Sequence, residues 1–497
     1  MAGMSKLMLC FCFWAVLAIA AAGQGKPNVL LIAVDDLKPV LGCYGDRVAR
    51  TPSIDKLAKR GRVFQMAYCN QAVCAPSRNN LMTGSLSTTL GIYNLSTNFR
   101  KAVPDAVTLT QLFMTNGWRA EGIGKIFHVG HGNHGDEASW SVPFQPEKVI
   151  AYADPKSSAG GQLTREEALF ANEHLGNISS LPRGAAWEAA EVEDNAYPDG
   201  RIAEEGIRRL RARAKEPGQP FFLALGFVKP HLPLCAPKKY WDLYDRNKFK
   251  LARFQRPPEG APHYAGKTLL ELNQYEPIPE RGPLSNDLQR TLIHAYYASV
   301  SYMDAQVGRV LDELDRLGLG SNTIVLLWGD HGWHLGDHGS WTKHTNYEQA
   351  NRIPLIIAAP GVTKGGGRTM QPAGTVDIYP TLAELAGLRT DGLPQKLDGV
   401  SLVPVLRDPS ARVREFTTHV FPRQRGREHV LGRAVRTGRY RLIEWKPAGG
   451  PESSADIELY DYKADPDERK NLAGVRPDVV RSLRKILAGM PEARRPL

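Results

Sequence analysis

The chain has 497 residues, of which 42% are hydrophobic and 23% are charged. These proportions are typical of a folded globular protein and exclude a collagen-like or low-complexity chain. The length is too great for one small core, so we expect one large domain and a smaller one. The formal net charge of +11 favours anionic partners.

The first 24 residues differ from the rest and predict a secretory signal peptide. Lys6 gives a weakly positive start, residues 7–22 are almost wholly apolar, and residues 20–23 (Ala-Ala-Ala-Gly) offer a cleavage site. An uncleaved membrane anchor is the alternative, because the run is near the lower limit for a span. We expect cleavage and an exported protein without stable membrane association: periplasmic or secreted, or lysosomal in a eukaryote.

Four cysteines remain after this cleavage, namely Cys43, Cys69, Cys74 and Cys235. In an exported protein some of them could pair, but they make no dense disulfide framework. We therefore expect a fold stabilised by its hydrophobic core. For an exported basic protein, acidic glycans are the expected partners and nucleic acid is not.

Four apolar runs predict buried parallel strands, and each run ends in polar residues. The runs are residues 28–34, 118–123, 221–228 and 323–328. The polar residues after them are, in chain order, Asp35 and Asp36, Lys125 and His128, His231, and Asp330 and His331. A fifth strand is expected over residues 353–359.

Helical patterns alternate with these strands. They cover residues 54–61, the region around 109–113, and residues 201–214, 287–317 and 378–385. This alternation predicts an α/β fold with a mainly parallel sheet flanked by helices. Ligands bind outside the carboxyl ends of such strands, so the polar strand ends are expected to converge.

Two segments lack a clear period and are expected to be loops over the surface. Residues 129–199 are rich in Gly, Ser, Glu and Pro, and residues 236–282 are rich in Pro and charges. The composition shifts again near residue 410. We predict a main domain over residues 25–410 and a C-terminal α+β subdomain over residues 411–497, with a small antiparallel sheet drawn from residues 434–445 and 458–461 and a helix over 477–487.

Cys74 begins the stretch Cys-Ala-Pro-Ser-Arg, residues 74–78. A lone cysteine is more often a small buried hydrophobe than a reactive group. This one stands near the expected start of a helix and close to Arg78, which is where reactive cysteines are found. Both interpretations stay open at this point.

Asp35, Asp36, Asp330 and His331 follow two of the predicted strands. Three carboxylates at close quarters repel one another unless a cation holds them, and a hard divalent ion such as calcium takes oxygen ligands. Nitrogen is an unusual calcium ligand, so His331 is the weakest member. An Asp-Asp pair alone is usually a turn or a helix cap, but the third aspartate at a second strand end favours a metal site.

Several short sequence blocks, taken together, resemble the type I sulfatases, a formylglycine-dependent family. The matching blocks are residues 34–37, 41–46, 74–78 with Thr83-Gly84, 124–125, 229–231 and 329–332. A closer likeness to the iduronate-2-sulfatase group lies in residues 71–78, 124–128 and 330–339. The resemblance covers essentially the whole mature chain and is thin over residues 129–199 and after residue 408.

The resemblance implies an alkaline-phosphatase-like α/β fold and a modified residue 74. A separate formylglycine-generating maturation enzyme would oxidise Cys74 to formylglycine (3-oxoalanine), whose hydrated aldehyde is the nucleophile. One calcium ion would polarise the sulfate oxygens. The implied metal ligands are Asp35, Asp36, Asp330, His331 and the modified Cys74.

Further site residues are carried over from the resemblance. Arg78 would hold residue 74 and the metal carboxylates, Lys125 would neutralise sulfate charge, and His128 would take a proton so that sulfate can leave. His231 and Lys343 would stabilise or protonate the leaving sugar oxygen. Trp333 would contact the sugar, with ordinary packing as the equal alternative. Individually, such lysines and histidines are most often surface charges or hydrogen-bonded residues of the loops and core.

The expected activity is hydrolysis of sulfate esters in a sulfated glycan, as in glycosaminoglycan degradation. The narrow expectation is the 2-O-sulfate of a terminal uronic acid, and another sulfated polysaccharide is the alternative. A phosphomonoester or phosphonate hydrolase on the same fold would usually have a Ser or Thr nucleophile, and a glycan-binding relative without activity would not need the intact set around Cys74. Both are the weaker hypotheses.

Overall fold

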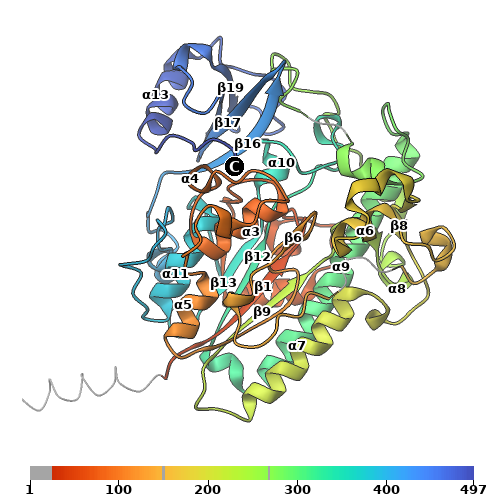
Figure 1. Ribbon diagram of the computed structural model, residues 1–497, viewed down its shortest axis with the longest axis vertical. Coiled ribbons are helices and arrows are strands. Elements are labelled where there is room, and N and C mark those ends of the chain that lie inside the picture. Colours follow the sequence, from red (N-terminus) through yellow and green to blue (C-terminus); the bar gives the residue numbers. More distant parts are fainter. Residues whose placement is uncertain (1–24, 148–151, 267–268) are drawn as a thin grey trace, which may run out of the picture.

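The computed structural model describes residues 25–147, 152–266 and 269–497. The predicted signal peptide lies outside these ranges. Within them, a seven-stranded sheet crosses the main domain in the order β14-β2-β13-β12-β1-β9-β4 (Figure 1). In this order the strands are Gly367–Thr369, Arg62–Phe64, Leu355–Ala358, Thr323–Gly329, Asn28–Val34, Phe221–Phe227 and Arg119–Gly124.

The four strands predicted as parallel, β12, β1, β9 and β4, lie side by side and are parallel. The strand expected over residues 353–359 is present as β13, but it pairs antiparallel with β12. The reason lies in its connection: after β12 the chain stays at the carboxyl edge through residues 330–354 and makes no crossover helix back to the other edge. β13 therefore begins at the edge where β12 ends.

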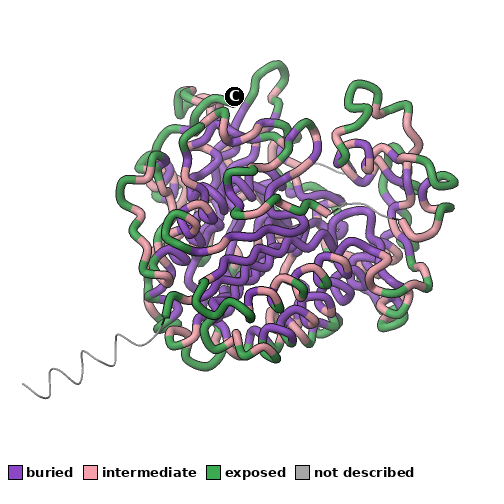
Figure 2. Tube along the Cα trace, turned by 60° about the horizontal axis from the view of Figure 1, so that its bottom comes forward, coloured by how far each residue is buried: buried purple, intermediate pink, exposed green. Residues whose placement is uncertain are grey.

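Helices cover both faces of the sheet, as the alternating pattern predicted. On one face lie α2 (Pro52–Arg60), α7 (Pro198–Ala214) and α9 (Asn286–Arg316), and on the other lie α3 (Cys74–Thr83), α5 (Leu109–Thr115) and α11 (Ile378–Leu385) (Figure 1). Alternate residues of β1 face the two layers: Leu30 and Ile32 pack in the first core and Val29 and Leu31 in the second. The central strands are buried throughout (Figure 2). They are therefore a rigid base for the residues at their ends.

The C-terminal region forms the predicted antiparallel sheet with one helix. The strands are β16 (Phe416–Arg425), β17 (Glu428–Thr437), β18 (Tyr440–Lys446) and β19 (Asp456–Asp461), and α13 (Pro477–Ala488) packs on them. The pattern over residues 434–445 spans parts of two strands joined by a tight turn, and β16 was missed. Both errors come from alternation that continues through a short turn.

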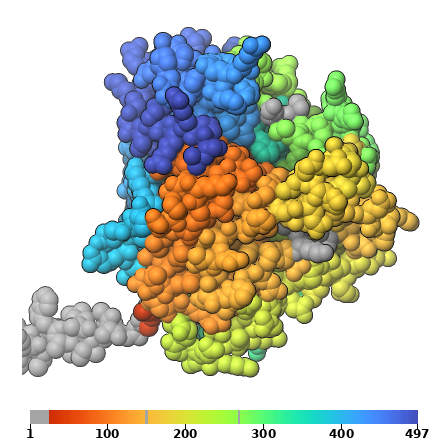
Figure 3. Space-filling view, in the orientation of Figure 1, coloured from red at the N-terminus to blue at the C-terminus, as the bar shows by residue number. Residues whose placement is uncertain are grey.

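The two segments expected to be surface loops are in fact paired with each other. β7 (Gly184–Ala185) of the first segment pairs with β11 (Tyr275–Glu276) of the second. β8 (Trp187–Glu188), also in the first segment, pairs with β10 (Leu234–Cys235), which directly precedes the second. The first segment also carries α6 (Arg165–Ala171), visible in yellow in Figure 3. These segments join to form one layer, which contributes buried side chains to the site described below.

Shorter elements connect these parts. The helices are α4 (Ser87–Leu90), α8 (Lys238–Trp241), α10 (Glu348–Asn351) and α12 (Val403–Arg407), and the two-residue strands are β3 (Ala67–Tyr68), β5 (Val129–Gly130), β6 (Asn133–His134) and β15 (Ala373–Gly374). In the described ranges no helix combines the length and hydropathy needed to cross a bilayer.

Candidate active site

The carboxyl ends of the four parallel strands bring the predicted residues together. Val34 of β1 is in register with Gly329 of β12 and Phe227 of β9, so the residues that follow these strands start at one level. Asp36 has a left-handed backbone, with φ 58°, and its N–H donates to Asp330 Oδ1 over 3.0 Å. This turn lets two consecutive carboxylates, Asp35 and Asp36, reach the same cluster.

Cys74 is the first residue of α3 and lies at the centre of this cluster. Its Sγ is 3.2 Å from His331 Nε2 and 3.9 Å from Lys125 Nζ. Burial raises the pKa of the Cys74 thiol well above its usual range, and this outweighs the lysines nearby. An unmodified thiol here is therefore a poor nucleophile, in contrast to the reactive cysteine that its place at a helix start suggested.

Arg78, one turn further along α3, ties three strand ends together. Its guanidinium is fully buried; Nε donates to Asp330 Oδ2 over 3.0 Å, and Nη2 donates to Asp35 Oδ1 over 3.1 Å. Nη1 donates to the carbonyl oxygens of Lys125 and Ile126, just beyond β4. A buried charge needs partners of this number and geometry, and Arg78 has them.

The carboxylates respond differently to this environment. Although burial opposes it, the charges of Lys125, His231 and Arg78 hold the pKa of Asp35 well below its usual range. Burial and the neighbouring Asp35 raise the pKa of Asp330 to about 7. Burial also raises the pKa of Asp36. Two of the three buried aspartates, Asp36 and Asp330, are therefore harder to ionise than an exposed aspartate, although Arg78, Lys125 and Lys343 match the three in number.

These three buried carboxylates and their neighbours fit a divalent cation. Ligand atoms of Asp35, Cys74, Asp330 and His331 lie within 4.8 Å of one another, and Asp36 forms an overlapping group with Cys74 and His231. Burial lowers the pKa of His331 to about 4, so its imidazole is neutral and free to coordinate. The donor set is mostly oxygen, which hard cations prefer.

Lys343 and His231 also line the cavity that holds Cys74, and both contact Glu271, which was not among the predicted site residues. Lys343 Nζ is 3.1 Å from Asp36 Oδ1 and 2.8 Å from Glu271 Oε2. Glu271 Oε1 is 3.0 Å from His231 Nε2. Glu271 therefore holds both residues that were expected to act on the leaving group.

His128 lies beside these groups with one ring nitrogen free. Its Nε2 is 3.2 Å from His131 Nδ1, and its buried Nδ1 has no hydrogen-bond partner among the described residues. Burial and the charge of Lys125 lower the pKa of His128 well below its usual range. The neutral ring is therefore able to accept a proton.

Trp333 packs in the core, which is the alternative to the predicted sugar contact. It is 4% exposed and packs in the core between the sheet and α9. Lys343 Nζ lies 5.4 Å from the centre of its ring. In this structure Trp333 supports Lys343 from below and is not part of the cavity lining.

A cavity of ≈ 350 Å³ opens above Cys74. It is lined by the predicted residues Cys74, His128, His231 and Lys343, and also by His131, Glu166, Phe170, Glu271 and His344, among others. Glu166 and Phe170 come from α6, and Glu271 comes from the segment 236–282. Nothing local in the sequence distinguishes the two acids, since acidic residues in aperiodic segments are usually solvated. The pairing of short strands brings their segments together.

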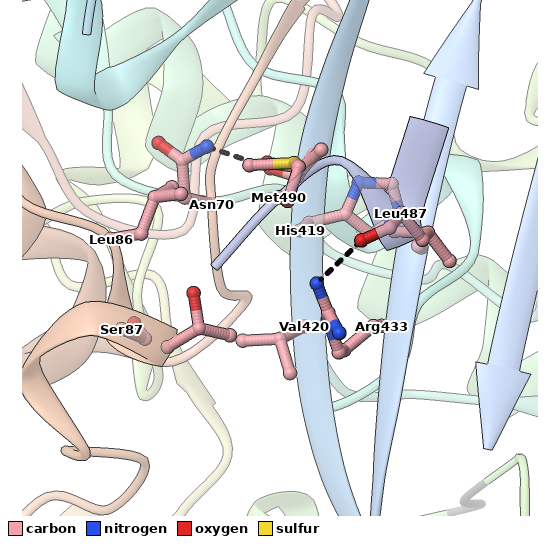
Figure 4. Close-up of a pocket in the computed structure, with 11 residues that line it drawn as sticks. Asn70, Leu86, Ser87, His419, Val420, Arg433, Leu487 and Met490 are labelled. Carbon is pink, nitrogen blue, oxygen red and sulfur yellow. Dashed lines mark hydrogen bonds between the residues drawn. The ribbon is translucent and has the colours of Figure 1, made fainter. Parts of the chain in front are cut away.

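A second, much smaller cavity lies between α4 and the C-terminal sheet (Figure 4). Its volume of ≈ 20 Å³ is enough for about one water molecule. Arg433 Nη2 donates to the carbonyl oxygen of Leu487 over 3.1 Å, and Asn70 Nδ2 donates to that of Thr418 over 2.7 Å. The Asn70 bond fastens the C-terminal region to the main domain, whereas the Arg433 bond lies within the C-terminal region. None of the predicted site residues lines this cavity.

The fold and the strand-edge cluster define a hydrolase with a buried, cation-ready site for an anionic group. The family described as Sulfatase matches residues 27–388, and a second family, N-sulphoglucosamine sulphohydrolase C-terminal, matches residues 336–492. The chain belongs to the sulfatase family and is a sulfuric ester hydrolase.

Individual relatives agree with this assignment. Iduronate 2-sulfatase of Mus musculus is 36% identical over 424 residues, which cover 77% of this chain and 73% of the relative. A sulfatase of Formosa agariphila is 32% identical over 470 residues, covering 90% and 83%. Among solved structures, the phosphonate monoester hydrolase of Agrobacterium radiobacter has a TM-score of 0.70 at 20% identity, covering 93% of this chain and 95% of that one, which shows the fold alone.

Proposed function

We propose that this protein is an exported, calcium-dependent sulfatase that uses formylglycine at position 74 to hydrolyse the 2-O-sulfate of a uronic acid in a sulfated glycan. The observation that carries the proposal is the position of Cys74. It lies at the point where the four strand ends meet, within reach of the cation-ready cluster, Lys125 and the cavity.

The burial of Cys74 supports its modification before folding by a formylglycine-generating enzyme. The side chain is only 2% exposed, so a maturation enzyme would need the unfolded segment. When present, the hydrated aldehyde supplies an oxygen nucleophile and a way to release sulfate by returning to the aldehyde. Its attack requires the sulfur to sit directly above residue 74, at the floor of the cavity.

Asp35, Asp36, Asp330 and His331 would hold the calcium ion, together with the oxygen of modified residue 74. The bound ion supplies a positive charge that polarises sulfate oxygens. Arg78 orients two of these carboxylates and keeps the helix carrying residue 74 against them. Its role is therefore positioning.

The remaining residues divide between the two ends of the reacting bond. Lys125 lies 3.9 Å from Sγ and would pair with the sulfate. His128, neutral and with Nδ1 free, would take a proton at residue 74 so that sulfate can depart. Lys343 and His231, both held by Glu271, would stabilise or protonate the leaving sugar oxygen.

The substrate assignment rests on the 36% identity with iduronate 2-sulfatase and on the net charge of +11. The test is a screen of defined sulfated di- and oligosaccharides, with a phosphonate monoester for comparison, each with and without a calcium chelator. We expect chelator-sensitive release of sulfate from 2-O-sulfated uronates. Release of sulfate from another sulfated sugar alone would change the substrate assignment. Turnover of the phosphonate alone would overturn the proposal.

A further inference from the structure

Glu166 is a buried acid that none of the steps above uses. It lies in the first turn of α6, lines the cavity over Cys74 and is 3% exposed. Among the described residues its carboxyl group has neither a hydrogen bond nor an ion pair. Because Glu166 borders the cavity, its carboxyl group can be met there by a group from outside the chain. Leaving it without any such partner would cost about 1–3 kcal/mol.

The charges next to Glu166 limit which chemical group could be its partner. One of its carboxyl oxygens lies within 4.8 Å of a carboxyl oxygen of Glu271 and of a ring nitrogen of His231. Glu271 is already paired with Lys343 and His231, and these charges hold the pKa of Glu271 well below its usual range despite burial. A second cation at this place would face the Lys343 ammonium, only 2.8 Å from Glu271. A carboxylate would face the negative charge of Glu271.

A hydroxyl group satisfies these constraints, since it both donates and accepts a hydrogen bond and carries no charge. Burial and the charge of Glu271 raise the pKa of Glu166 to about 8. A hydroxyl can pair with the protonated acid as well as with the carboxylate. Phe170 and Leu169, on the same helix, line the cavity beside it and offer an apolar surface for a sugar ring.

We propose that Glu166 is a specificity-determining residue that hydrogen-bonds a free hydroxyl on the sugar ring bearing the sulfate ester. This inference rests on the proposed sulfatase function. It assigns to α6 the selection of hydroxylated sugar sulfates over sulfate esters that carry no such group. It also requires any uronate carboxylate of the substrate to point away from the Glu166–Glu271 wall.

The test compares two substrates across substitutions at one position. Glu166→Met keeps the length of the side chain but cannot make the bond, whereas Glu166→Gln can. With a 2-O-sulfated disaccharide, we expect kcat/KM to fall by about 30-fold in the Met variant and to be largely recovered in the Gln variant. With 4-nitrophenyl sulfate, which lacks hydroxyl groups, both variants should stay within about 3-fold of wild type.

Two controls separate this role from a structural one. Glu173→Met changes an exposed acid just beyond α6 and should leave both substrates unaffected. The thermal midpoint of Glu166→Met should be equal to or above that of wild type, because no partner is lost. An equal loss on both substrates, no loss on either, or a lowered midpoint overturns the role of Glu166. A wild-type protein inactive on both substrates instead contradicts the sulfatase function itself.

Discussion

The floor and the wall of the cavity are built in different ways. At the floor, Asp35, Arg78 and Lys125 are buried at strand and helix ends, and each charge has an opposite charge or a carbonyl within hydrogen-bonding distance. In the wall, Glu166 lies on a short helix of a long connecting segment and has no polar partner among the described residues. The charges of Asp35, Arg78 and Lys125 are thus paired within the protein, whereas Glu166 can find a partner only in the cavity.

This difference indicates that the floor carries the reacting groups and that the wall carries groups that select the substrate. Reacting groups must hold their positions closely, and buried strand ends fix them more firmly than loops do. Groups that select a substrate can sit on connecting segments, which change without disturbing the sheet. Glu271 joins the two regions, since it comes from a connecting segment but holds Lys343 and His231.

The largest expected effect is the loss of sulfate ester turnover when residue 74, at the centre of the floor, is replaced. Cys74→Ala should lower turnover of any sulfate ester by on the order of 10³-fold or more, because it removes the nucleophile. The matched control is Cys69→Ala, which truncates a buried thiol five residues earlier that does not line the cavity. Sulfate release measures both, and undiminished turnover by the Cys74 variant would exclude the mechanism.

A conservative change at Arg78 tests whether the floor also stabilises the fold. Arg78→Lys cannot reach Asp35, Asp330 and two carbonyl groups together, so we expect the free energy of unfolding to fall by about 3 kcal/mol. Arg60→Lys alters a half-exposed pair with Asp315 and should cost less than about 1 kcal/mol. Denaturant unfolding gives both values, and equal losses would contradict the distinction between paired buried and surface charges.

The last prediction concerns the pH dependence of stability that Glu166 causes. Glu166 has a raised pKa of about 8 in the folded chain, whereas an unfolded glutamate has one of about 4.3. Between these values the unfolded chain releases a proton that the folded chain keeps, so the free energy of unfolding falls as pH rises. In Glu166→Met this contribution to the pH dependence of the free energy of unfolding is absent.

The stability difference between Glu166→Met and wild type should therefore increase from pH 5 to pH 8 and level off above. Urea unfolding at a series of pH values measures it, with Glu173→Met as the control. A difference that is constant with pH would show that Glu166 is already ionised in the folded protein.

The fold and the floor were largely predictable from sequence because their signals are local. Uninterrupted apolar runs ending in Asp, Lys or His identify buried parallel strands and place their polar ends at one edge. The antiparallel direction of β13 was not predictable in this way, since it depends on a connection that stays at one edge. β16 was hidden by the short turn between strands of one hairpin.

The wall could not be predicted because its residues become neighbours only through tertiary pairing. Glu166 and Glu271 are 105 positions apart, in segments without period, and nothing local distinguishes them from solvated acids. For Trp333, position beside the metal block could not decide between a sugar contact and ordinary packing, and in the structure its ring packs in the core next to Lys343.

The central claim is that residue 74 does not act as a thiol. Trypsin should release residues 63–78 as one peptide, which carries Cys69 as well as Cys74. Mass spectrometry of this peptide from protein made in its native host, or together with a formylglycine-generating enzyme, tests the claim directly. We predict an aldehyde at position 74 and an unmodified thiol at position 69. A thiol at both positions in active protein would contradict the account.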